Sequence, residues 1–295
     1  MRLAVVSSDG KNVDLHLGRG KSLYVYDYDD ELSFVEMRSV EIADDAKHQG
    51  SKVLKACEDC DVLIAVQYGF KSKIKAEDAG IKLVMDEGPI EEVLQRYIDH
   101  YNFMKNATEQ NEDAVWRIAV MHHDMFGGRE PWLDSENAML KLLWTPFFDE
   151  FGIDLCLYGH SHYYSVSNVI YGRETVEETG HDAQLTDPQG TIYVASGSIT
   201  RHASTLDDEG KVPPIGENAG YTRLEEDETI YNLIDFTENT LTFKSYSAES
   251  NKEFNRFEIT KTSKQGGHSM KNSAWYLKPI AFFVGRIVNI INNHD

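Results

Sequence analysis

Two histidines separated by a single serine, His160 and His162, come directly after an apolar stretch that ends at Gly159. A second apolar stretch, residues 116–121, runs into His122. Neutral imidazole nitrogens are good ligands for borderline divalent metals. Both stretches are predicted to be strands, and the ends of adjacent strands are a common place for such ligands. We therefore expect His122, His160 and His162 to form a metal site.

Other residue types that could do chemistry lie in the first hundred residues. Cys57 and Cys60 have the spacing of a redox or metal-binding pair, although one such pair alone is a weak signal. Cys60 has a second interpretation as a small buried residue where a helix meets a strand. His16 lies in a polar, glycine-bearing loop between two predicted strands, and most histidines in such loops bind nothing.

The segments before residue 106 predict a compact α/β domain over residues 1–105. Three strands are expected first, and helices and strands then alternate. The predicted strands are residues 2–7, 22–28, 32–40, 61–66 and 81–85, and the predicted helices are residues 49–56, 71–79 and 89–101. The polar, aperiodic stretch 106–113 is predicted to be a linker.

A second α/β domain is predicted over residues 114–262. Its expected strands are residues 116–121, 153–158, 191–195, 229–236, 240–246 and 254–259, with one helix at residues 135–151. The polar region between His162 and Gly190 is predicted to be a loop. A tail, residues 263–295, carries an amphipathic helix. Lys278 and Arg286 interrupt its apolar run, so we do not expect it to span a membrane. We expect it to dock on the protein, with a membrane-surface or partner helix as the alternative.

Composition narrows the class of protein. The chain has 295 residues and a formal net charge of −20, which argues against nucleic acid as a partner. Three cysteines do not make a disulfide framework. The sequence begins with a strand-like segment and shows no signal peptide, so a cytoplasmic location is expected.

Several short motifs follow one another in the first hundred residues. They are Ser8-Asp9-Gly10, His16-Leu17-Gly18, residues 59–64, Ala79-Gly80-Ile81 and Gly88-Pro89-Ile90. Their order resembles the dinitrogenase iron–molybdenum cofactor biosynthesis family, a ribonuclease-H-like α/β domain, over about residues 1–102. The resemblance implies a carrier of an iron–sulfur-type cofactor or its precursor. It makes His16 a ligand to a cluster iron, Arg19 and Lys21 partners of an anionic cluster, and Cys60 a candidate thiolate ligand.

Motifs in the second half have a different resemblance. Residues 116–124, 151–155, 159–162 and 190–198 resemble the C-terminal part of a calcineurin-like metallophosphoesterase of the purple-acid-phosphatase-like branch. Such enzymes are hydrolases that use two metals bridged by an aspartate and a hydroxide. The resemblance implies that His122 and His160 bind one metal and His162 the other, with manganese, zinc or iron as the metal.

The upstream motifs of that second family are missing before residue 114. No Gly-Asp-x-x-Asp and no Gly-Asn-His occur there, and the string Asp14-Leu15-His16 belongs to the loop described above. Without a bridging carboxylate, repulsion between two cations opposes the second metal. We expect weak binding of one metal, little or no hydrolysis and no assignable catalytic residue. A partial α/β sandwich without its N-terminal strands also has an open sheet edge, where a protein partner could pair.

Three hypotheses therefore stand. In the first, the protein is a cofactor carrier or metal sensor whose phosphoesterase-derived half is structural. In the second, it is a phosphoesterase whose missing ligands come from another chain. In the third, two gene fragments are joined and the C-terminal half has no evolved role.

Overall fold

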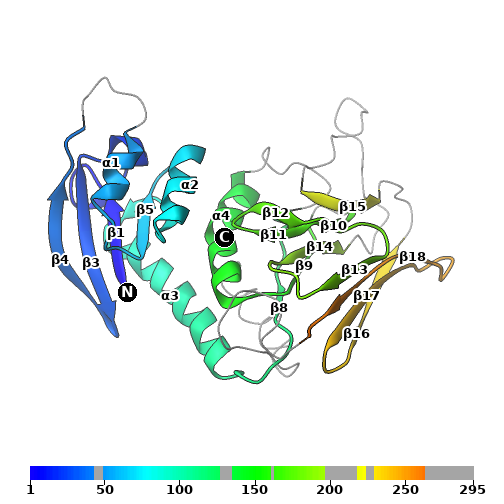
Figure 1. Ribbon diagram of the computed structural model, residues 1–295. Helices are drawn as coiled ribbons and strands as arrows, with labels where there is room; N and C mark the ends of the chain where they lie inside the picture. The colour runs from blue at the N-terminus through cyan, green and yellow to red at the C-terminus, as the bar shows by residue number, and fades with distance from the viewer. Residues whose placement is uncertain (43–48, 127–134, 161–162, 197–217, 224–228, 263–295) are drawn as a thin grey trace, which may run out of the picture. The chain divides into compact units, whose positions relative to one another are not determined.

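The computed structural model describes the chain except residues 43–48, 127–134, 161–162, 197–217, 224–228 and 263–295. The chain divides into two compact units, an N-terminal unit, Met1–Phe103, and a C-terminal unit, Met104–Asp295. Both combine sheets with helices (Figure 1), which confirms the predicted α/β class. The predicted C-terminal helix lies outside the described residues. Within the described part of the chain, no helix is long and apolar enough to cross a membrane.

The N-terminal unit is built on a five-stranded sheet with the order β4-β3-β1-β5-β6. The strands are β1 (Arg2–Val6), β3 (Ser22–Asp29), β4 (Glu31–Ser39), β5 (Val62–Ala65) and β6 (Lys82–Met85). β1 is antiparallel to β3, and β3 to β4, whereas β1, β5 and β6 are parallel to one another. A two-residue pair, β2 (Asn12–Val13) with β7 (Gly88–Pro89), closes the loop after β1.

Helices cover both faces of this sheet because its strands are apolar on both sides. α1 (Gly50–Lys55) and α2 (Phe70–Asp78) contribute to a core that also contains every other residue of the central strands. The alternate residues Leu3, Val5 and Ile64 point to the other face and are fully buried. α3 (Ile90–Glu109) is tied to this unit by Asn102, whose amide donates to the hydroxyl of Tyr28 at 2.7 Å.

α3 is longer than the sequence analysis predicted. Helical backbone continues to Glu109 and so enters the stretch predicted to be a linker. Met104 is fully buried, and the hydroxyl of Thr108 donates to the carbonyl of Met104 at 2.8 Å. The buried residues form a continuous stripe along the helix, and the polar side chains of residues 105–109 lie mostly on its exposed side. These polar residues are the reason that the sequence showed no helical pattern there.

The C-terminal unit contains two sheets. The first has the order β15-β10-β14-β9-β8 and the second β13-β18-β17-β16. Their strands are β8 (Ile118–Val120), β9 (Leu155–Tyr158), β10 (Tyr164–Ser167), β13 (Ala183–Thr186), β14 (Ile192–Ser196), β15 (Ala219–Arg223), β16 (Ile230–Phe236), β17 (Thr240–Ser247) and β18 (Glu253–Thr260). A hairpin of β11 (Val169–Tyr171) and β12 (Glu174–Glu177) lies beside them.

A shared apolar core joins these two sheets. It contains Leu155 and Val194 from the first sheet and Phe243 and Phe257 from the second. The helix α4 (Ser135–Phe151) packs on the other side of the first sheet, since Phe148 stacks on Tyr193 with ring centroids 6.3 Å apart. The unit is therefore layered as helix, sheet and sheet.

The prediction that the region after His162 is a loop is wrong. Four strands, β10 to β13, occur between Tyr164 and Thr186. β10 is buried on both faces although it contains Ser165 and Ser167, because hydrogen bonds satisfy polar groups there. The hydroxyl of Ser167, for example, accepts from the backbone N–H of Tyr193 at 2.9 Å.

Candidate functional site

A short turn carries His16 at the carboxyl end of strand β5. The backbone of this turn pairs with the residues just after β5, since Leu17 N–H donates to the carbonyl of Gln67 at 2.8 Å. A 3₁₀ turn, η1 (Leu17–Arg19), follows His16. Open α/β sheets bind ligands at the carboxyl ends of their parallel strands. The turn thus lies where this class of sheet has its binding sites.

The His16 ring stabilises its own turn through a hydrogen bond. Its Nδ1 accepts the backbone N–H of Gly18 at 3.0 Å, so the neutral ring carries its proton on Nε2. Burial of the half-buried ring and the nearby Arg19 guanidinium lower the pKa of His16. A neutral imidazole with a defined tautomer is therefore the form present near neutral pH.

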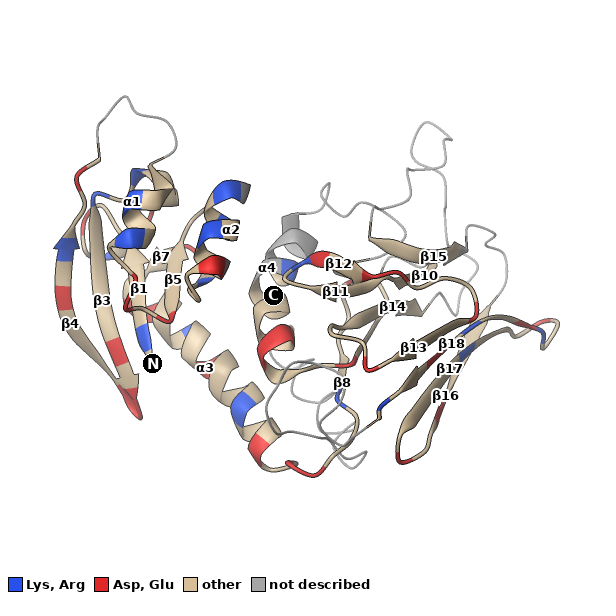
Figure 2. Ribbon diagram, viewed as in Figure 1, with Lys and Arg blue, Asp and Glu red and all other residues tan. Residues whose placement is uncertain are grey.

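Two lysine-bearing helices lie beside this turn in a chain that is acidic as a whole. α1 carries Lys52 and Lys55, and α2 carries Lys71, Lys73 and Lys75 (Figure 2). The helices meet at their first turns, where a Cβ on Gly50 would lie 2.4 Å from the Ser72 hydroxyl and 3.8 Å from the Leu17 side chain. Local charge of this kind favours an anionic ligand despite the negative net charge.

Cys60 lies at the other end of β5 from the His16 turn. It comes two residues before β5, where Asp61 N–H donates to the carbonyl of Arg2 at 2.9 Å, whereas Gln67 comes two residues after β5. Extended backbone from residue 60 to residue 67 spans roughly 20 Å. The structure brings Arg19 to His16 but does not bring Cys60 to them.

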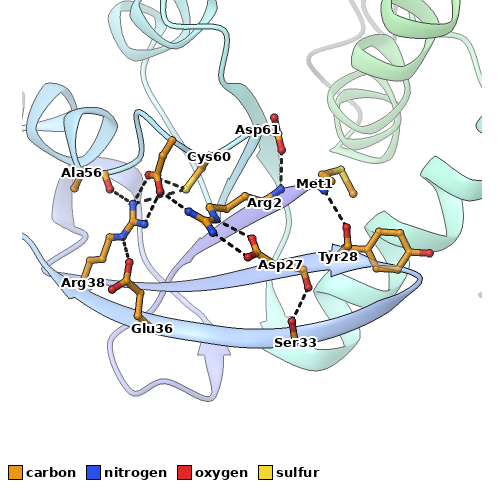
Figure 3. Close-up of polar contacts among 11 residues, drawn as sticks. Met1, Arg2, Asp27, Tyr28, Ser33, Glu36, Arg38, Ala56, Cys60 and Asp61 are labelled. Atoms are coloured by element: carbon orange, nitrogen blue, oxygen red, sulfur yellow. Dashed lines mark hydrogen bonds and ion pairs between the residues drawn. The ribbon is translucent and has the colours of Figure 1, made fainter.

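The surroundings of Cys60 are shown in Figure 3. Its sulfur lies 4.0 Å from Nη1 of Arg38, and Arg38 also donates to the carboxylate of Asp59 at 2.7 Å. Arg2 joins the same carboxylate at 2.8 Å and binds Asp27 on β3. Cys57 and Cys60 are both buried and free. This end of the sheet is therefore covered by a network of ion pairs with two thiols beneath it.

Two of the predicted metal ligands meet in the C-terminal unit. The carbonyl of His122 accepts the N–H of Gly159 at 3.0 Å, which brings the ends of β8 and β9 together. Nδ1 of His160 and Nε2 of His122 are 3.4 Å apart, and both rings are exposed. Two ligands about 2.0–2.1 Å from a tetrahedral zinc are separated by about that distance. His162 lies outside the described residues.

The neighbours of these two imidazoles do not complete a site. The ring of His123 is 4.3 Å from that of His160 and tilted by 41°, as in ring packing. Asp124 is buried and its carboxylate accepts the hydroxyl of Tyr163 at 3.0 Å. Among the described residues, no three histidine, cysteine, aspartate or glutamate side chains are grouped so that they could hold a metal ion.

The N-terminal unit is thus an α/β domain with the His16 turn at the carboxyl end of β5, and the C-terminal unit is a layered α/β sandwich with a pair of imidazoles. Residues 1–100 match the family model described as dinitrogenase iron-molybdenum cofactor. The chain therefore contains a cofactor-related domain of this family at its N-terminus. None of the curated proteins matches the chain.

Solved structures give weaker likenesses. A purple acid phosphatase from yellow lupin (Lupinus luteus) seeds is similar over 50% of this chain and 25% of its own, at 16% identity and a TM-score of 0.38. A putative NifB protein from Thermotoga is similar over 33% of this chain and 87% of its own, at 23% identity and a TM-score of 0.27. The chain thus spans a quarter of the lupin phosphatase, and scores this low decide nothing about function.

Proposed function

We propose that the N-terminal unit binds an iron–sulfur-type cofactor, or a precursor of one, at the carboxyl edge of its sheet. The observation that carries the proposal is the His16 turn, whose neutral imidazole is flanked by Arg19 and by two lysine-rich helices. An imidazole is an iron ligand, and the positive charge suits an anionic cluster.

A single assigned iron ligand suits a carrier of a preassembled cluster better than a site that assembles one. His16 is the one ligand that we assign at this edge, and Cys60 is on the order of 20 Å away along β5. A preassembled cofactor held by one bond and by surrounding charge can be received and released. Ligation through Nε2 requires the ring proton to move from Nε2 to Nδ1, which breaks the hydrogen bond that Nδ1 accepts from Gly18 N–H at a cost of about 1 kcal/mol.

The test keeps the turn intact while it removes the ligand. In His16→Asn the side-chain oxygen can still accept the Gly18 N–H, but the imidazole is gone. The full chain is incubated without oxygen with ferrous iron and sulfide, desalted, and its iron and visible absorption are measured. We expect His16→Asn to lose most of the bound iron and His181→Ala, at a histidine outside both proposed sites, to keep it. Equal iron in His16→Asn and the unchanged chain would contradict the proposal.

A second function is favoured by the distance between two imidazoles. We propose that Nε2 of His122 and Nδ1 of His160, 3.4 Å apart, hold one divalent metal weakly. His162 would be a further ligand, and the absence of a bridging carboxylate among the described neighbours argues against hydrolysis. The C-terminal unit would then be a phosphoesterase-derived domain that has kept part of a metal site.

Calorimetric titration with zinc, and separately with manganese, tests this second proposal. We expect micromolar or weaker binding that His160→Ala abolishes and His181→Ala leaves unchanged, since His181 instead contacts the carbonyl of Phe254. The metal-loaded chain should not hydrolyse an aryl phosphate. Turnover that disappears in His160→Ala would show instead that the site is catalytic.

A further inference from the structure

Cys57 and Cys60 form a turn at the amino end of β5 that neither proposed function uses. The N–H of Cys60 donates to the carbonyl of Cys57 at 2.8 Å, directly after the last turn of α1. A turn closed by this bond keeps its end Cα atoms within about 7 Å, and a disulfide needs about 4.4–6.8 Å. The backbone can therefore accept a disulfide between these two residues.

The two thiols already interact and differ in character. The Cys57 thiol donates a hydrogen bond to the Cys60 sulfur, which lowers the pKa of Cys60, and the same bond together with burial raises the pKa of Cys57. The Arg38 guanidinium, 4.0 Å from the Cys60 sulfur, also favours its thiolate. Asp59 opposes this effect, since the Cys60 thiol donates to its carboxylate at 3.7 Å, although Arg38 and Arg2 also bind that carboxylate.

Cys60 is also the more accessible of the pair. Cys57 is 0% exposed and Cys60 is 5% exposed. Arg38 lies beside the Cys60 sulfur (Figure 3), and so does Asp59; their side chains are 20% and 47% exposed to solvent. Two partly exposed side chains thus lie next to the Cys60 sulfur, whereas Cys57 is fully buried.

We propose that Cys57 and Cys60 are a redox-active pair that forms a reversible disulfide by exchange with a small-molecule disulfide such as oxidised glutathione. The Cys60 thiolate attacks one sulfur of that disulfide, and a mixed disulfide forms as the first small thiolate leaves. Cys57 loses its proton and attacks the Cys60 sulfur, which releases the second small thiolate. The two cysteine protons end on the two released thiols, so the chain loses two electrons and the reagent gains them.

The third cysteine provides an internal reference. Cys156 lies in the middle of β9, is fully buried, and burial raises the pKa of its thiol. The other two cysteines of the chain are Cys57 and Cys60, so no second cysteine lies near Cys156 in sequence. It should stay reduced in the native protein under conditions that oxidise the pair.

The experiment counts free thiols in the native full-length chain. Samples are equilibrated without oxygen in graded ratios of reduced and oxidised glutathione, quenched with acid, unfolded, labelled with a maleimide and analysed by mass spectrometry. We expect Cys57 and Cys60 to lose their label together in one two-electron transition while Cys156 keeps its label. Three labelled cysteines at every ratio would overturn the proposal.

Single variants test the order of attack. Cys57→Ser lacks the second nucleophile and should accumulate a glutathione adduct at Cys60, whereas Cys60→Ser should stay unmodified. Arg38→Gln should slow the reaction of Cys60 several-fold at neutral pH, and Cys156→Ser should behave as the unchanged chain. Equal reactivity of Cys57 and Cys60 in the two serine variants would contradict the assignment of Cys60 as the attacking thiol.

Discussion

His160 has a backbone φ of +66°, in the left-handed region that residues with a side chain rarely enter. This conformation costs roughly 1–2 kcal/mol for an L-residue other than glycine. The residue nevertheless holds its imidazole 3.4 Å from that of His122. Strain of this kind is concentrated at functional sites, which agrees with the proposed role of His160 as a metal ligand.

Replacement of His160 by glycine should separate stability from metal binding. Glycine adopts a positive φ without the cost, so we expect His160→Gly to raise the free energy of unfolding by about 1 kcal/mol. The same variant should lose zinc binding. Urea unfolding and calorimetry measure the two effects. His122→Ala is the matched control, which should lose zinc without a gain in stability.

The charge of Arg19 should be visible in the titration of His16. Burial and Arg19 both lower the pKa of His16, so Arg19→Gln removes one cause and leaves the other. We expect the pKa of His16 to rise in Arg19→Gln and to stay below that of an exposed histidine. Proton NMR of the imidazole Cε1–H against pH measures it, and an unchanged or lower pKa would contradict this geometry.

At the scale of single residues, the sequence correctly predicted which side chains lie close together where they follow neighbouring strands. His122 and His160 follow two adjacent strands, and their rings lie together, although metal binding by them stays a prediction. Chain order alone did not show that a strand separates His16 from Cys60. The bond between Asp124 and Tyr163 was equally hidden, because it depends on packing between segments 39 residues apart.

At the scale of elements, the close approach of two backbones before β14 explains why Gly190 is a glycine. A Cβ at Gly190 would lie 2.4 Å from the carbonyl oxygen of Ile170. Thr191 exchanges two backbone hydrogen bonds with Ile170 at 2.9 Å each, so neither strand can move away without breaking them.

Gly190→Ala should therefore destabilise the C-terminal unit. We expect a loss of about 1–3 kcal/mol in the free energy of unfolding, as for other overpacked sites. Gly180→Ala is the matched control, because a Cβ at Gly180 meets no atom within 4 Å. It should be neutral or stabilising by about 0.5 kcal/mol, since alanine restricts the unfolded chain. Thermal or urea unfolding of both variants measures the two changes in the free energy of unfolding, and equal values would contradict this explanation of Gly190.

Elements with a clear period of two or of 3.6 were predictable from the sequence. The five strands of the N-terminal sheet agree with their predicted ranges to within a few residues, as do β8, β9, β14, β16, β17, β18, α1, α2 and α4, whereas α3 is longer than predicted and β15 was not predicted. The short strands β10 to β13 were missed for a physical reason. Each of these strands has only three or four residues, and β12 is exposed along its whole length, so a period of two has too few positions in which to show.

At the scale of the whole molecule, each of the two units has its own apolar core. The fragment 1–109, which keeps all of α3, should therefore fold alone. We expect dispersed amide signals in NMR and cooperative urea unfolding. The fragment 1–88 lacks α3 and its fully buried Val93 and Leu94, so it should be unfolded or molten. A disordered 1–109 fragment would show that the N-terminal unit depends on the rest of the chain.

β5 separates the His16 turn from the Cys57–Cys60 turn by several residues of hydrogen-bonded strand. Groups more than about 7–10 Å apart that share no partner act additively. Occupancy at one end of the strand and oxidation at the other are then independent variables, and the N-terminal unit has four chemical states. An oxidant would then form the Cys57–Cys60 disulfide without releasing a cofactor bound at the His16 turn.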